Sequence, residues 1–190
     1  MITQRLVKIT AVTAAEICTR FDLAEKARSL LHNGMGPGEF VEALVANQQY
    51  NAGIDFVAHA LPAREAVWWG CLCFQHACGV HLGGPDKAAA IAAVQWVLQP
   101  NEQNRAAAKA PAAATGPDSP AGALARAANW TGGSLGPPNA PPVPPGPFMP
   151  AMAVATAVKF AAIKVEPAKM ADTRRLFVEL GIGVAEGRYL

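Results

Sequence analysis

The chain has 190 residues, of which 52% are hydrophobic and 16% charged, and its formal net charge is +2. This length corresponds to one domain, or one domain with an appendage. The high apolar content excludes a disordered chain. The scattered basic residues are not interleaved with aromatic ones, which argues against a nucleic-acid partner. Alanine, the commonest residue, has the highest helix propensity and lets helix axes approach closely. We therefore predict an all-α fold.

Prolines and glycines divide the chain into about nine predicted helices. Thr13 and Glu16 form a capping box that predicts a short helix, and a second short helix is expected to end before Gly34. The next predicted helix begins at Pro37, and further helices are predicted over 50–61, 62–79 and 85–99. A helix over 102–114 is expected to kink or break at Pro111, and another helix is predicted over 121–130. After a proline-rich stretch, helices are predicted over 151–165 and from Pro167 to Gly181 or Gly183. We expect a compact stack of helical hairpins or a solenoid-like array.

The helix predicted from Pro62 to Gly79 is the expected centre of this array. Pro62 suits a helix start, and the residues that follow Glu65 are apolar on nearly every side of the helix, including Trp68 and Trp69. A helix that is apolar all round is buried. We therefore expect residues 1–131 to pack around it as an N-terminal helical array.

A proline-rich segment, 132–150, separates this array from a C-terminal helical pair, 151–190, which we expect to pack as part of the same domain. Eight prolines in the segment exclude a regular helix or strand and favour polyproline II or irregular structure. Two interpretations remain open. Pro-x-x-Pro sequences such as Pro141 to Pro144 suit an aromatic groove of a partner. Alternatively, the segment is an internal strap across Trp68, Trp69 and Trp130. We favour the strap, because proline–tryptophan packing buries both residues.

Cysteine and histidine gather near the end of the central helix. Cys71, Cys73, His76, Cys78 and His81 are zinc-ligand types, and the weak metal candidates among them are Cys73, His76, Cys78 and His81. No second ligand pair follows His81 in the sequence, so we predict no metal and no cofactor. A cysteine nucleophile requires an exposed thiolate beside a histidine. The apolar surroundings of Cys71 and Cys73 predict protonated thiols instead.

Arg64 also has two interpretations. An arginine near a core is usually paired with an acid, here Asp55 or Glu42. Alternatively, it is a recognition residue at the mouth of a groove. As partner-binding candidates we select Arg64, Trp68, Trp69, Trp130, Pro141 and Pro144.

Several stretches together resemble a family of small, uncharacterised bacterial helical proteins. They are 58–69, Trp96-Val97 followed by Pro100, Glu102 and Arg105, 132–135 with Pro137-Pro138, and 180–182 with Gly187. The resemblance begins at about Phe40. It implies a loose association with gene neighbourhoods for type VI secretion, and it implies no catalytic residue.

We therefore expect a non-enzymatic protein–protein interaction module, such as an adaptor, chaperone or assembly factor, that is linked to a bacterial secretion system. The alternatives are a Cys/His-dependent enzyme and a zinc-binding structural module. The expected partner is a protein, without nucleic acid. No apolar run is long enough for a membrane span. Unpaired cysteines favour a reducing, cytoplasmic location.

Overall fold

A computed structural model describes residues 6–79, 83–137 and 139–189 of the protein. Within these residues the secondary structure is entirely helical, which confirms the predicted all-α class. The helices are α1 (Ala14–Cys18), α2 (Glu25–Arg28), α3 (Pro37–Ala46), α4 (Tyr50–Ala60), α5 (Ala63–Cys78), α6 (Gly84–Leu98), α7 (Glu102–Ala107), α8 (Lys109–Ala114), α9 (Pro120–Asn129), α10 (Met149–Ala162), the 3₁₀ turn η1 (Pro167–Lys169) and α11 (Met170–Ala185).

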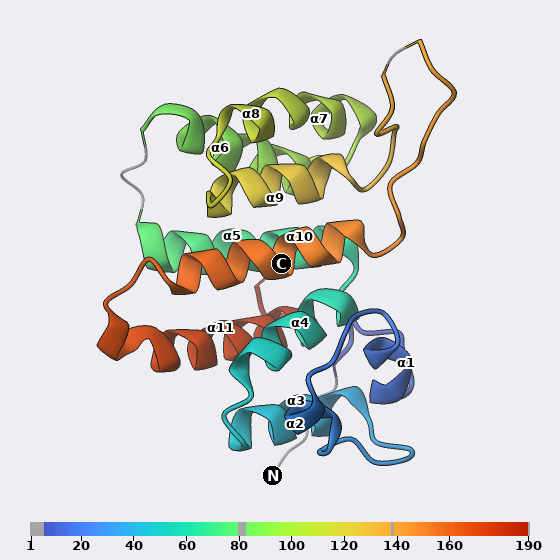
Figure 1. Ribbon diagram of the computed structural model, residues 1–190, viewed down its shortest axis with the longest axis vertical. Coiled ribbons are helices and arrows are strands. Elements are labelled where there is room, and N and C mark those ends of the chain that lie inside the picture. The colour runs from blue at the N-terminus through green and yellow to red at the C-terminus, as the bar shows by residue number, and fades with distance from the viewer. Residues whose placement is uncertain (1–5, 80–82, 138, 190) are drawn as a thin grey trace.

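The helices form layers, with α6 to α9 at one end, α5 and α10 in the middle, and α4 and α11 beyond them (Figure 1). Helices α1 to α3 lie at the α4 end of the stack (Figure 1). Helix α10 contacts α9 on one side and α4 on another, and it lies beside α5. The chain therefore returns after the proline-rich segment to fill the middle of the stack, and the layers do not follow one another in sequence as they do in a simple solenoid.

The central helix occupies the predicted position, with Pro62 at its N-cap and Gly79 at its C-cap. Trp69 is completely buried, and its indole Nε1 donates a hydrogen bond of 2.8 Å to the carbonyl of Phe177 in α11. This bond satisfies the one polar group of a large buried ring. Trp68, by contrast, is only half-buried. Of the tryptophan pair, Trp69 alone lies in the interior.

Glycines allow the helices to cross closely. A Cβ on Gly70 of α5 would overlap the side chain of Leu124 in α9. A Cβ on Gly181 of α11 would lie 2.5 Å from Cγ1 of Val57 and 3.0 Å from the ring of Trp69. The predicted helix end at Gly181 or Gly183 was therefore wrong, because α11 continues through both residues to Ala185. Gly181 serves packing rather than termination.

The helix predicted over 102–114 is interrupted at Ala108, three residues before Pro111. Helix α7 ends at Ala107 and α8 begins at Lys109, so Pro111 falls in the first turn of α8. A proline there loses no helical hydrogen bond, whereas in a continuous helix it would clash with the carbonyl of Ala107. The structure thus splits the predicted helix of 102–114 into two.

Candidate interaction surfaces

The proline loop, defined here as residues 136, 137 and 139–147, projects from the helical layers between α9 and α10 (Figure 1). Among its described prolines, Pro145 is half-buried and the others are exposed, namely Pro137, Pro141, Pro142, Pro144 and Pro147. Prolines packed across buried tryptophans would themselves be buried. The predicted internal strap therefore does not fit the structure, and Pro141 and Pro144 face solvent.

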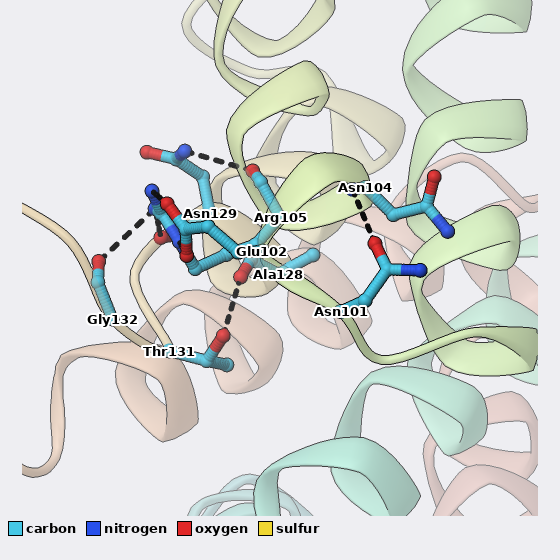
Figure 2. Close-up of polar contacts among 8 residues, drawn as sticks. All are labelled: Asn101, Glu102, Asn104, Arg105, Ala128, Asn129, Thr131 and Gly132. Carbon is cyan, nitrogen blue, oxygen red and sulfur yellow. Dashed lines mark hydrogen bonds and ion pairs between the residues drawn. The ribbon is translucent and has the colours of Figure 1, made fainter.

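Arg105 anchors the start of this segment (Figure 2). Its Nε and Nη2 donate to the Glu102 carboxylate at 2.6 and 2.7 Å, and its Nη1 donates to the carbonyls of Asn129 and Gly132 at 2.7 and 3.1 Å. The Asn129 amide donates in return to the Arg105 carbonyl at 2.9 Å. The hydrogen bond from Arg105 lowers the pKa of Glu102. One guanidinium thus ties α7 to the C-terminal end of α9 and to the chain that leaves it.

The next residues close the base of the loop. Gly133 has a φ of +73°, and a side chain there would also overlap the Arg105 guanidinium. The Ser134 hydroxyl accepts hydrogen bonds from the amides of Gly136 and Val143 at 3.1 and 3.0 Å, and the Leu135 amide donates to the Val143 carbonyl at 2.8 Å. These bonds join the two sides of the loop at its base.

Phe148 holds the other end of the segment, immediately before α10. Its ring lies 6.3 Å from the His59 ring, and the Arg20 guanidinium lies 6.0 Å from its centroid. His59 in turn stacks on Phe21 at 4.8 Å and donates from Nδ1 to the Asp55 carbonyl at 2.8 Å. Phe148 is 40% exposed, and its remaining surface brings the second end of the proline loop into contact with the helical body.

His59 is a buried titratable group at this second anchor. Its Nε2 is buried without a hydrogen-bond partner among the described residues. Burial lowers the pKa of His59, which keeps the imidazole neutral at pH 7. The nearby charges are those of Arg20, Asp55 and Lys159, and Lys159 pairs with Asp55 at 2.6 Å.

Trp130 lies beside the first anchor, in a cavity of about 330 Å³ lined also by Lys109, Arg126 and Leu135. The Arg126 guanidinium is 5.9 Å from the centroid of the Trp130 ring. This half-buried tryptophan therefore shares a cavity with Ser134 and Leu135, the residues that lead into the proline loop.

A second cavity, of about 260 Å³, lies between α5 and α6. We call it the α5–α6 groove. Its lining is mostly apolar and comprises Trp68, Cys71, Leu72, Phe74, Gln75, Gly79, Lys87, Ala90, Ile91, Val94 and Leu124. The Trp68 indole donates from Nε1 to the Tyr189 carbonyl at 2.8 Å, which fixes the ring at the groove.

Arg64 does not pair with Asp55 or Glu42 in the part of the chain that the structure describes. Its Nε donates instead to the Val97 carbonyl in the last turn of α6, at 2.8 Å. A cation is favourable there because the carbonyl end of a helix carries partial negative charge. Lys159 takes the expected place beside Asp55. Arg64 therefore holds α6 against α5.

The cysteine and histidine residues of the central helix differ in how far they are buried. Cys73 is fully buried, Cys78 is half-buried, and His76 is exposed with its ring edge-on to Phe177 at 5.9 Å. His81 lies outside the described residues. Burial raises the pKa of Cys71 to about 12 and also raises that of Cys73, so both thiols stay protonated and weakly nucleophilic. No thiol bonds to an imidazole within the described ranges, and no group of three or more ligand-type side chains there is placed to hold a metal ion.

The contacts of Arg105 with Glu102, Asn129 and Gly132 were not predicted from the sequence, although one sequence feature pointed to them. Glu102 and Arg105 are three residues apart, the spacing of an intrahelical ion pair, and they were noticed only as part of the resemblance together with Gly132 and Gly133. The structure brings all four residues together. His59 and Trp68 also lie in a stretch of the resemblance, 58–69, but no residue spacing in the sequence pointed to the second anchor or to the α5–α6 groove.

Fold and surfaces together define an all-helical protein that carries a proline-rich loop anchored at both ends. The chain belongs to a family of unknown function, DUF6931, whose model matches residues 40–185. This match begins where the resemblance was expected to begin, and it supports an uncharacterised helical domain. No curated protein and no solved structure matches the chain. Among the described helices, none has the length and apolarity required to cross a bilayer.

Proposed function

We propose that this protein is a non-enzymatic interaction module, acting as an adaptor, chaperone or assembly factor, and that its proline loop binds a partner protein with an aromatic-lined groove. The observation that carries the proposal is the exposure of Pro141 and Pro144 on a loop whose two ends are fixed. Proline-rich segments in polyproline II conformation are preorganised ligands for such grooves.

The anchors support this proposal energetically. Binding orders flexible segments at the expense of affinity, and a loop held in advance loses less conformational entropy. Arg105 and Ser134 restrict the start of the loop, and Phe148 restricts its end. Trp130 and Arg126, beside the first anchor, offer an aromatic and a cationic contact at the edge of the same surface.

The link to a bacterial secretion system is the finer part of the proposal, and its support is the resemblance alone. We also propose a cytoplasmic location, which the unpaired cysteines support. The interaction surface is independent of both, because it rests on the geometry of the loop.

The proposal is tested by affinity capture from the native host with three forms of the full chain. The wild-type protein, the double variant Pro141→Ala/Pro144→Ala and the control Pro117→Ala, which changes an exposed proline in another loop, are compared by quantitative mass spectrometry. We expect a protein that the wild type and the control enrich and the double variant does not. Equal enrichment by all three forms would show that the loop is not the ligand.

A further inference from the structure

The cavity of about 330 Å³ beside Trp130 carries positive charge without a matching acid. It is formed by residues of α8, of α9 and of the chain that leads into the proline loop. Lys109 and Arg126 are the charged residues of its described lining, and none of the described lining residues is acidic. A ligand that enters this cavity therefore meets two cations whose charge the lining does not compensate.

The Arg126 guanidinium is held in place without an anionic partner. It lies 5.9 Å from the centroid of the Trp130 ring, one turn further along α9. Arg64 and Arg105, which are also half-buried, donate hydrogen bonds to carbonyls or to a carboxylate. Within the described ranges, the side chains of Arg126 and Lys109 have no such bond and no ion pair. The contact with the ring thus orients the guanidinium and leaves its N–H groups for a ligand.

Ser134 adds a third donor to the same cavity. Its hydroxyl accepts hydrogen bonds from the amides of Gly136 and Val143 at 3.1 and 3.0 Å. A hydroxyl has two acceptor positions and one proton to donate. Both acceptor positions are taken, and the proton has no acceptor among the residues that the structure describes. The hydroxyl can therefore only donate to a ligand, and an ionised carboxylate, which only accepts, is the matching side chain.

The partial negative charge at the C-terminal end of α9 is already compensated. The Asn129 carbonyl accepts from Arg105 at 2.7 Å, and the Ala128 carbonyl accepts from the Thr131 hydroxyl at 2.8 Å (Figure 2). The Glu102 carboxylate, which is also close to this end, is bound by two nitrogens of the same Arg105. The charge left to act on a ligand is therefore that of the two cations.

We propose that this cavity binds an Asp or Glu side chain on a segment of a partner protein, with its carboxylate on the Arg126 guanidinium. Arginine and carboxylate form paired hydrogen bonds of matching geometry. Leu135, which is 43% exposed, offers the segment an apolar contact beside the cations and immediately precedes the proline loop. The inference rests on the proposed function for the protein nature of the ligand, but its lining residues lie outside the loop. Nucleic acids and anionic membranes are instead recognised by basic residues clustered over a whole face.

The test is a nuclear magnetic resonance titration of the isotope-labelled full chain, followed at the indole N–H signal of Trp130, which the variant Trp130→Phe assigns. The probe is a capped synthetic peptide in which acidic residues flank a leucine. We expect the signal to shift and to saturate below about 10 mM peptide. Arg126→Gln should raise the dissociation constant by about tenfold, because it removes charge-assisted hydrogen bonds. Lys109→Gln should raise it by about two- to fivefold, the effect of an exposed ion pair.

The matched control is Lys26→Gln, which changes an exposed lysine of α2 at the opposite end of the stack (Figure 1). It should leave the dissociation constant unchanged. Pro141→Ala/Pro144→Ala should also bind the peptide as the wild type does, so a failure of the loop proposal and a failure of this inference give different results. Melting temperatures check that each variant folds, and Lys109→Gln, at an exposed position, tests the site even if Arg126→Gln is unstable.

Two further probes identify what the cavity selects. The same peptide with Asn and Gln in place of Asp and Glu should not shift the Trp130 signal, and inorganic phosphate at equal concentration should shift it less than the acidic peptide does. The proposal is overturned if the acidic peptide causes no shift, if the neutral peptide or phosphate binds as well as the acidic peptide, or if Arg126→Gln and Lys109→Gln bind it as well as Lys26→Gln.

Discussion

The core around Trp69 and the proline loop are held in shape by different interactions. Side-chain packing orders the core, whereas backbone restraints order the loop. In the core, glycines and alanines bring helices so close that side chains interlock, and the indole of Trp69 finds its hydrogen bond in α11. In the loop, few side chains are buried, and shape comes from proline φ angles and from backbone bonds at Ser134. The comparison indicates that burial stabilises the helices, while the loop contributes little buried surface.

Removal of Trp69 should have the largest effect on stability. The change Trp69→Ala leaves a cavity in the interior and removes the side-chain hydrogen bond to the Phe177 carbonyl. We expect a loss of roughly 3–5 kcal/mol in the free energy of unfolding, the usual range for a buried aromatic residue. Urea denaturation followed by circular dichroism measures it. A melting temperature within a degree or two of the wild type would refute the buried position.

Gly181→Ala tests the close helix crossing with a single added methyl group. The new Cβ would overlap Val57 and crowd Trp69, and overpacking of this kind costs about 1–3 kcal/mol. The control is Gly116→Ala, where a Cβ would meet no atom within 4 Å. Chemical denaturation should give a lower free energy of unfolding for Gly181→Ala than for Gly116→Ala. Equal stability would mean that α11 does not pack as tightly as described.

Acid should weaken the second anchor through His59. Burial lowers its folded-state pKa below the ordinary value of 6.5, so the unfolded chain binds a proton more readily. Stability from this group is complete above pH 6.5 and is lost as the pH falls toward the folded-state pKa. Melting temperatures of the wild type and of His59→Phe between pH 7.5 and pH 5 provide the measurement. We expect the wild type to lose more stability than the variant over this range, and parallel curves would contradict the assignment.

The smallest effect on stability is expected in the loop. Pro141→Ala/Pro144→Ala changes two exposed residues, so the free energy of unfolding should change by less than about 0.5 kcal/mol per site. The same urea titration applies. A loss comparable to that of Gly181→Ala would show that the loop contributes to the core after all.

The sequence allowed the central helix to be predicted because a helix that is apolar all round is normally buried, although Trp68 and Leu72 on one side of it are only half-buried. A glycine, by contrast, can mark either the end of a helix or a close crossing of two helices. Gly181 was predicted to end a helix, but in the structure it marks a close crossing. The strap was predicted from the affinity of proline for tryptophan, but Trp69 is already enclosed by neighbours that include α11, which composition cannot reveal. Arg64 was given an acidic partner, whereas the structure offers it the carbonyl end of α6. Local sequence patterns were sufficient to predict the helices. The surfaces could not be predicted in this way, because they are formed by contacts between segments that are distant in the sequence.

The most direct test of the interaction proposal is a binding titration of the captured and purified partner against the full chain. The account predicts that Pro141→Ala/Pro144→Ala raises the dissociation constant by about tenfold or more, equivalent to about 1.4 kcal/mol, while Pro117→Ala leaves it unchanged. Equal dissociation constants for the wild type, the double variant and the control would contradict it.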